Sequence, residues 1–124
     1  MEVTAVSKYL HVSPKKMKEF GHISIGLSPM TAIERLQAME GKMGKLLAKS
    51  VKSAYDNAVN THKLEPSRLQ IKSIQILKGP HLKRWRAVSR GMAHQIKRRT
   101  THVRIILSVR QDDKSHKKEK EIKE

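Results

Sequence analysis

The sequence predicts an α+β domain that carries a long projecting β-hairpin. Residues 69–78 and 101–109 are rich in β-branched side chains at the spacing typical of strands. Three earlier stretches repeat apolar side chains at helical spacing, and two of the three begin with a Ser-Pro pair. If the two strands pair as a hairpin, the strongly basic stretch between them forms its outer part.

The charge of that stretch is all of one sign. Residues 66–111 are 46 residues without a single Asp or Glu. The same segment carries twelve cationic side chains, namely Arg68, Lys72, Lys78, Lys83, Arg84, Arg86, Arg90, Lys97, Arg98, Arg99, Arg104 and Arg110. Because like charges repel, an ordered stretch of this kind predicts a partner that supplies negative charge, and phosphate is the best candidate.

Composition narrows the function classes. The chain has 124 residues, a formal net charge of +16 and no Cys. The length predicts one domain, which we place at residues 1–110, and the charge favours nucleic acid over an anionic membrane or an acidic protein. Without Cys, a disulfide, a thiolate zinc site and a cysteine nucleophile are excluded. No signal-peptide pattern or membrane-length apolar run occurs, so we expect a cytoplasmic protein with no membrane partner.

The elements of the first half follow from apolar spacing and start signals. Residues 2–12 alternate in a way that predicts a strand covered on both sides. Ser13 and Pro14 then start a short helix that should end before Gly21, because serine caps and proline fits the first helical turn. A second Ser-Pro pair starts a helix of about three turns that should reach Gly41.

The third helix has the clearest pattern. Its apolar face comprises Met43, Leu46, Leu47, Val51, Ala54 and Ala58. Its outer row comprises Lys45, Lys49, Lys52 and Asp56, and the three lysines are either a solvated face or a contact to RNA. Asn57 is either a hydrogen-bonded helix residue or a contact to phosphate or sugar.

The hairpin must project from the rest of the domain. The change of apolar phase between Ile71 and Ile74 predicts a bulge. Pairing of the strands should set residues 78–79 opposite residues 98–99 and centre the turn on residues 89–91. Each arm then holds about 20 residues, or about 65 Å at ~3.3 Å per residue. A domain of this size is only ~25–30 Å across.

Several short motifs carry a resemblance. They are Ser13-Pro14-Lys15-Lys16, Ser53-Ala54 with Asn57-Ala58, Gly79-Pro80 with Lys83-Arg84, Gly91 with Ala93, and Lys97 to His102. In order and spacing they resemble the family of bacterial large-subunit ribosomal protein twenty-two, over about residues 3–110. The departures lie mostly at the tip, where Ala87, Val88 and Met92 stand in place of a proline and two arginines, and at Ile25, where the family commonly has arginine.

The resemblance implies a fold, a location and partners. The fold would be an α+β body with a three-stranded antiparallel sheet and three helices. The body would lie near the exit of the peptide tunnel of the large ribosomal subunit, in contact with large-subunit ribosomal RNA. The hairpin of residues 78–102 would thread through that RNA and line the tunnel wall, with its tip close to large-subunit protein four and to the nascent polypeptide. No homo-oligomer is expected.

We therefore expect two sets of site residues. The RNA-binding set comprises Lys15, Lys16, Lys18, Lys78, Lys83, Arg84, Trp85, Arg86, Arg90, His94, Lys97, Arg98, Arg99 and His102. The tunnel-facing tip comprises Ala87, Val88, Ser89, Gly91, Met92 and Ala93, with Gly91 permitting a turn at positive φ. Trp85 is expected to stack on a base or sugar rather than to be buried in the body.

Other functions have less support. The seven His show no metal-ligand spacing, and no catalytic motif occurs, so we expect no metal, no cofactor and no enzyme activity. The alternative function is an architectural DNA-binding protein with a basic β-arm, in which Val88 and Met92 would act as the wedge. Residues 111–124 balance five Lys against five acidic residues and are expected to form a mobile tail.

Overall fold

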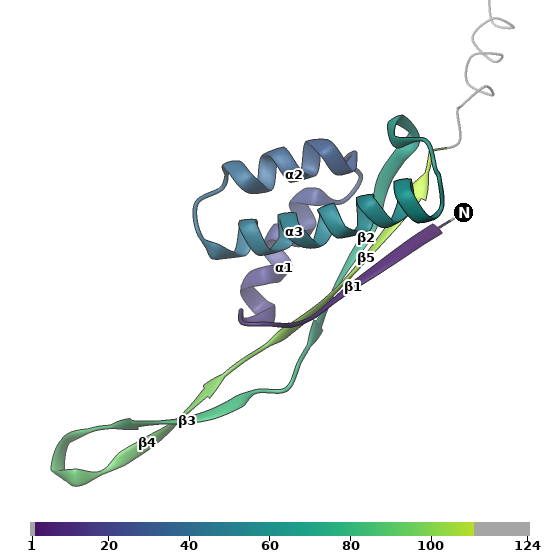
Figure 1. Cartoon of the computed structure of the whole chain (residues 1–124). Helices are drawn as coiled ribbons and strands as arrows, with labels where there is room; N and C mark the ends of the chain where they lie inside the picture. The colour runs from purple at the N-terminus through teal and green to yellow at the C-terminus, as the bar shows by residue number, and fades with distance from the viewer. Residues whose placement is uncertain (1, 111–124) are drawn as a thin grey trace, which may run out of the picture.

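The computed structural model describes residues 2–110 and has an α+β architecture (Figure 1). The elements, in chain order, are β1 (Glu2–Leu10), α1 (Pro14–Ser24), α2 (Pro29–Ala38), α3 (Lys42–Asp56), a π-helical turn η1 (Asn57–Thr61), a 3-10 turn η2 (Pro66–Arg68), β2 (Leu69–Lys78), β3 (Leu82–Ala87), a 3-10 turn η3 (Ser89–Gly91), β4 (Ala93–Arg98) and β5 (Thr101–Val109). The fold class predicted from the sequence is confirmed. Residues 111–124, for which a mobile tail was expected, lie outside the described residues.

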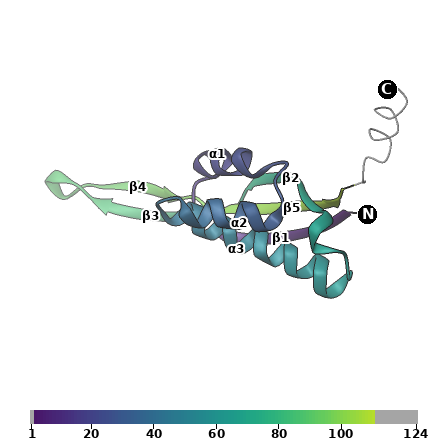
Figure 2. The same cartoon turned by 90° about the horizontal axis from the view of Figure 1, so that it is seen from above.

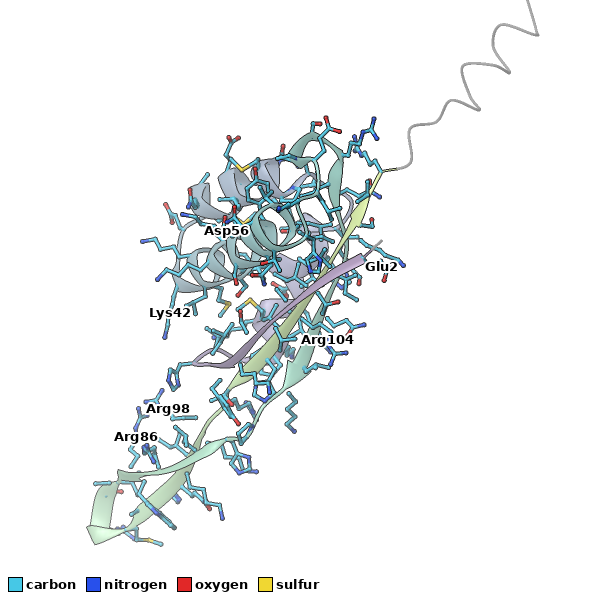
Figure 3. The ribbon with its side chains drawn as sticks, turned by 45° about the vertical axis from the view of Figure 1, so that its right-hand side comes forward. Glu2, Lys42, Asp56, Arg86, Arg98 and Arg104 are labelled. Carbon is cyan, nitrogen blue, oxygen red and sulfur yellow. The ribbon has the colours of Figure 1, made fainter. Side chains whose placement is uncertain are left out.

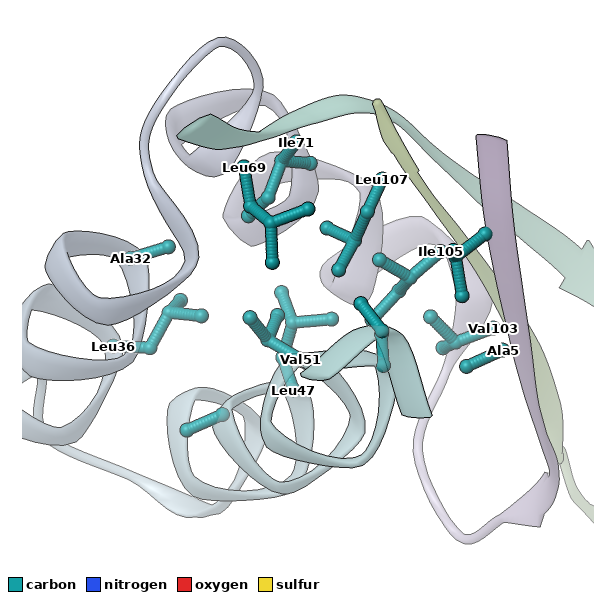
Figure 4. Packing of buried hydrophobic residues seen from close by; sticks show 14 of the residues in the cluster. Ala5, Ala32, Leu36, Leu47, Val51, Leu69, Ile71, Val103, Ile105 and Leu107 are labelled. Carbon is teal, nitrogen blue, oxygen red and sulfur yellow. The ribbon is translucent and has the colours of Figure 1, made fainter. Parts of the chain in front are cut away.

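The body is a three-stranded antiparallel sheet covered by helices on one face. The strand order is β1-β5-β2, so β5 is the central strand and pairs along both edges. Val103, Ile105 and Leu107 of β5 are fully buried, and they face Leu47 and Val51 of α3 (Figure 4). The alternating pattern of β5 and the apolar face of α3 thus form the two sides of one core.

The first strand differs from its prediction. Val3 and Ala5 are buried, whereas Thr4 is exposed and Val6 is 47% exposed, so β1 is covered on one side only. The reason is that the helices occupy a single face of the sheet, which local alternation of side chains cannot reveal. The strand also ends at Leu10 rather than at residue 12.

The helix starts are confirmed, but one predicted helix end is wrong. α1 and α2 begin at Pro14 and Pro29, each directly after a serine. α1 continues through Gly21 to Ser24, and a Cβ built on Gly21 would lie 3.6 Å from Cγ2 of Ile74. Gly21 therefore sits at the contact between α1 and β2 and does not terminate the helix.

The hairpin is divided into two sheets. β3 and β4 form a separate two-stranded sheet, in which Leu82 pairs with Arg98 and Ala87 with Ala93. The bulge is confirmed, since the register of β2 on β5 shifts between Ile71 and Ser73. The turn at residues 89–91 is confirmed as η3.

The expected pairing of residues 78–79 with residues 98–99 is wrong. Lys78 pairs with Thr101, and the backbone N–H of Gly79 donates to the carbonyl of Thr100 at 3.0 Å. Beyond that point Pro80 has no N–H to donate, so the strand ladder stops. The hydroxyl of Thr100 instead donates to the carbonyl of Pro80, and pairing resumes at Leu82.

The outer part of the hairpin, residues 82–98, is called the arm below. It extends away from the body in both views (Figures 1 and 2). Within it only Val88 and Ile96 are half-buried, and all other residues are exposed. The arm therefore projects as predicted and has no apolar core of its own. No helix within residues 2–110 has the length and apolar character needed to cross a membrane.

The body should fold without the arm. Replacing residues 83–98 by Gly-Asn removes no buried side chain of the core, so the free energy of unfolding should change by less than about 1 kcal/mol. Thermal unfolding followed by circular dichroism measures this. In the same shortened chain Leu47→Ala should cost about 2–5 kcal/mol, because it opens a cavity under the sheet. Loss of the cooperative transition on shortening alone would show that the arm is part of the core.

Candidate nucleic-acid interface

The cations of the arm are divided unequally between its two faces. Residues directly opposite each other in an antiparallel pair point to the same face, and successive pairs alternate. The pairs Arg84–Ile96 and Arg86–His94 therefore share a face with Leu82–Arg98, and Figure 3 shows the side chains of Arg86 and Arg98 on the projecting ribbon. We call this the arginine face. Strand alternation alone puts Arg84 and Arg86 on one face, whereas the placement of Arg98 beside them depends on the register of β3 on β4.

The other face carries lysine and an aromatic ring. Lys83 lies directly opposite Lys97, and Trp85 lies opposite Gln95. Like charges directly opposite each other destabilise a strand pair. Trp85 is 70% exposed and lies on the arm, so it is not packed against the body. Its stacking on a base or sugar remains a prediction.

No carboxylate within residues 2–110 pairs with a cation of the arm. Within residues 2–110 the two ion pairs are Glu65 with Arg68, at 3.1 Å, and Glu2 with Lys72. Both lie in the body, and the hydrogen bond and positive charge of Lys72 lower the pKa of the Glu2 carboxyl. Arg84 donates to the carbonyl of Lys83 at 3.0 Å, a neutral acceptor that removes no charge. The arm thus presents unopposed positive charge, which suits a polyanion.

The predicted cations of α1 lie beside the base of the arm. Lys15 and Lys18 line a hollow of about 570 Å³ together with Lys78 and Arg99. Lys16 lines a neighbouring groove with Lys97, Arg98 and Arg99. The structure therefore brings together residues far apart in sequence that were predicted separately. Their contact with RNA remains a prediction.

His102 has a structural role in the body. Its Nδ1 accepts a hydrogen bond from the backbone N–H of Tyr9 at 3.1 Å, and the two rings meet edge to face with centroids 5.0 Å apart. Tyr9 has φ of 58°, a conformation that costs free energy for a residue other than glycine. The imidazole stabilises this irregular part of β1, which leaves Nε2 as its nitrogen for the predicted RNA contact.

The tip of the arm is small and weakly charged. It comprises Ala87, Val88, Ser89, Gly91, Met92 and Ala93 around Arg90. Gly91 has φ of 68°, which confirms the predicted turn at positive φ, and Arg90 has φ of 62°. Two successive positive φ angles are typical of type I′ hairpin turns, where asparagine usually precedes the glycine. Because Arg90 is not a residue type typical of this conformation, the sequence did not predict its positive φ.

Two residues near the arm were not predicted. Lys42, at the start of α3, donates from Nζ to the carbonyl of His11 at 3.3 Å. Both side chains are exposed beside Lys16. In the sequence Lys42 is only a lysine that follows Gly41, which does not predict a place near the arm. Its position there depends on the packing of α2 on α3. Within residues 2–110, no cluster of three or more His, Asp or Glu could hold a metal ion.

The fold and this surface define a class: small, strongly basic α+β proteins with a projecting two-stranded arm. A family model described as Ribosomal protein L22p/L17e matches residues 5–108. The chain therefore belongs to the ribosomal protein L22p/L17e family. Members of this family are structural components of the ribosome, so the chain is a ribosomal protein and not an enzyme.

Relatives match along most of their length. The chain is 40% identical over 108 residues to the large ribosomal subunit protein uL22 of Syntrophobacter fumaroxidans, covering 87% of this chain and 98% of the relative. It is 37% identical to the protein of the same name from Opitutus terrae, covering 87% of this chain and 96% of the relative. The corresponding protein of Akkermansia muciniphila is 39% identical, with the same two shares of 87% and 96%.

Unopposed charge predicts a steep dependence of binding on salt. Each neutralised phosphate releases condensed counterion, so the log-log slope of affinity for a large-subunit RNA fragment against salt should be steeper than about −3. Filter binding over a salt series measures it. Arg86→Ala should reduce the slope by about 1, whereas Arg35→Ala on the exposed side of α2 should leave it unchanged. A slope shallower than about −3 for the unmodified chain would rule out an interface dominated by phosphate.

Proposed function

We propose that this protein is a structural component of the large ribosomal subunit that binds large-subunit ribosomal RNA with its arm and lines the polypeptide exit tunnel with the tip. Family membership supports the subunit, since the relatives are named as large-subunit proteins. As a ribosomal protein the chain works in the cytoplasm. Residues 1–110 act as one domain, from which the arm reaches into RNA.

The observation that carries the proposal is the arginine face. Arg84, Arg86 and Arg98 share one face of a ribbon with no carboxylate partner among the described residues. One guanidinium group can donate two parallel hydrogen bonds to two oxygens of a phosphate. This bidentate contact fixes the orientation of the phosphate and also adds affinity. A two-stranded ribbon is also thin enough to enter a gap between RNA helices. The arginine face therefore fits RNA backbone. Arg99 extends this contact toward the body, and Lys97 adds a cation from the other face.

The opposite face supplies contacts of a different kind. Trp85 is exposed between Arg84 and Arg86 in sequence but points to the face that carries Lys83 and Lys97. An exposed indole in this setting suits stacking on a base or a sugar. RNA would then contact both faces of the arm, with His94 and Arg90 toward the tip.

The tip is proposed to face the tunnel lumen. An arm that only binds RNA would be expected to stay basic to its end, whereas residues 87–93 are mostly small and carry one cation, Arg90. Such a surface adheres weakly to an unfolded chain that passes it. The partners at this end are the nascent polypeptide and large-subunit protein four, and no homo-oligomer is required.

The DNA-binding alternative has little left to support it. Met92 is 60% exposed at the tip, where a wedge would have to lie, but Val88 is half-buried. Membership in a ribosomal protein family provides a complete reason for the basic arm without DNA.

Substitutions at the base of the arm and at its tip should have different effects on incorporation into the subunit. Arg98→Ala with Arg99→Ala removes two charge-assisted contacts worth about 1.5–3 kcal/mol each, so incorporation into large subunits should fall by about tenfold or more. Val88→Ala with Met92→Ala should leave incorporation unchanged and alter only the passage of nascent chains or the binding of small molecules in the tunnel. Quantitative mass spectrometry of purified subunits from cells that express each tagged variant measures incorporation.

One outcome for these two double variants would contradict the assignment of the tip. If the two tip substitutions block incorporation as strongly as the arginine pair, the tip is an assembly contact and does not face the lumen. Circular dichroism of each variant serves as the control for folding, because all four side chains lie outside the buried core.

A further inference from the structure

A groove lies between the body and the base of the arm. Its volume is about 500 Å³. The body lines it with His11, Lys16 and Lys42, and the other side is lined by Arg84, Lys97, Arg98 and Arg99. We call this the junction groove. Six Lys or Arg side chains therefore line it, and none of the Asp or Glu residues in the described part of the chain does.

The connection across the junction is thin. Between the end of β2 and the start of β3, the hydrogen bonds to the returning strand are those of Gly79 and Pro80 with Thr100. Neither β3 nor β4 packs extensively on any helix or body strand within residues 2–110. Because the cations on the two sides of the groove repel one another, the free protein gains nothing by closing the arm toward the body.

The lysine on the body side is held at the groove. Lys42 Nζ donates to the carbonyl of His11 at 3.3 Å, which ties the start of α3 to the segment between β1 and α1. An ammonium group has three donors, so two remain for a ligand. Lys42, Lys16 and the arm arginines carry no ion pair within the described part of the chain.

The groove is continuous with the arginine face. Arg84 and Arg98 belong to both surfaces. A polyanion that follows the arginine face toward the body therefore stays on a positively charged surface until it reaches Lys16 and Lys42. RNA backbone has this continuity and a regular spacing of phosphates, which a short acidic peptide segment lacks.

We propose that the junction groove binds a segment of RNA backbone whose phosphates bridge body and arm and thereby fix the direction of the arm. This inference rests on the proposed function and adds to it a second site, with Lys42 and Lys16 as the body side of a clamp. Binding of RNA in the groove then restricts the direction of the arm relative to the body. Each bridging phosphate attracts the cations on both sides of the groove, which otherwise repel one another.

The test measures the arm direction directly. The chain has no Cys, so Gln37→Cys on α2 and Ser89→Cys at the tip give two unique spin-label sites. Distance distributions between the labels are recorded by pulsed electron paramagnetic resonance for the full chain, free and with purified bacterial large-subunit ribosomal RNA. Lys16→Ala with Lys42→Ala is the test variant. Lys8→Ala with Arg35→Ala is the matched control, since both cations are exposed, on β1 and α2, and line no part of the groove.

Ribosomal RNA should reduce the width of the label-to-label distance distribution by about half in the unmodified chain and in the control, because a ligand that bridges a hinge rigidifies it. The Lys16/Lys42 variant should keep its broad distribution while it still binds RNA, with a salt slope smaller in magnitude by about 2. Polyglutamate, added as an acidic peptide probe, should not narrow any distribution.

Four results would overturn the inference. A narrow distribution in the free chain would show that the body alone fixes the arm. Equal narrowing in the Lys16/Lys42 variant would remove the groove from the account and leave the proposed function standing, whereas failure of the unmodified chain to bind RNA would remove both. Narrowing by polyglutamate would assign the groove to an acidic protein instead.

Discussion

Burial of the inner face of β5 is the interaction on which the rest of the structure depends. Val103, Ile105 and Leu107 are fully buried against α3, and each contributes about 1.5–3 kcal/mol through burial. β5 also pairs with both β1 and β2, so it holds the sheet together. The same chain segment leads directly back from the arm at Thr100. Packing of β5 therefore stabilises the body and sets where the arm begins.

The arm has no such apolar support. It is a two-stranded ribbon without a core, and such ribbons are marginal in water. Lys83 opposite Lys97 makes the pair less favourable still. These features oppose folding of the free arm, yet they are what a surface for RNA requires. The chain thus combines a body that folds through apolar burial with an arm whose cations have no carboxylate partner within residues 2–110.

The sequence predicted those elements whose local pattern agrees with their packing. The faces of α3 and β5, the bulge after Ile71 and the turn at Gly91 are examples. It failed where tertiary placement decides: the open face of β1, the continuation of α1 through Gly21, and the pairing of Lys78 with Thr101. The site shows the same division. The cations were identified by type, but the place of Arg98 on the face of Arg84 and Arg86 depends on strand register, and the place of Lys42 depends on helix packing.

The proposed role requires that ribosomal RNA supply the negative charge that balances the arm. Sedimentation of the native protein from lysate, before and after treatment with ribonuclease, measures whether it does. The protein should sediment with large ribosomal subunits and move to the light fractions when RNA is digested, while deoxyribonuclease should have no effect. A protein that stays in the light fractions without treatment, or that is released by deoxyribonuclease alone, would contradict it.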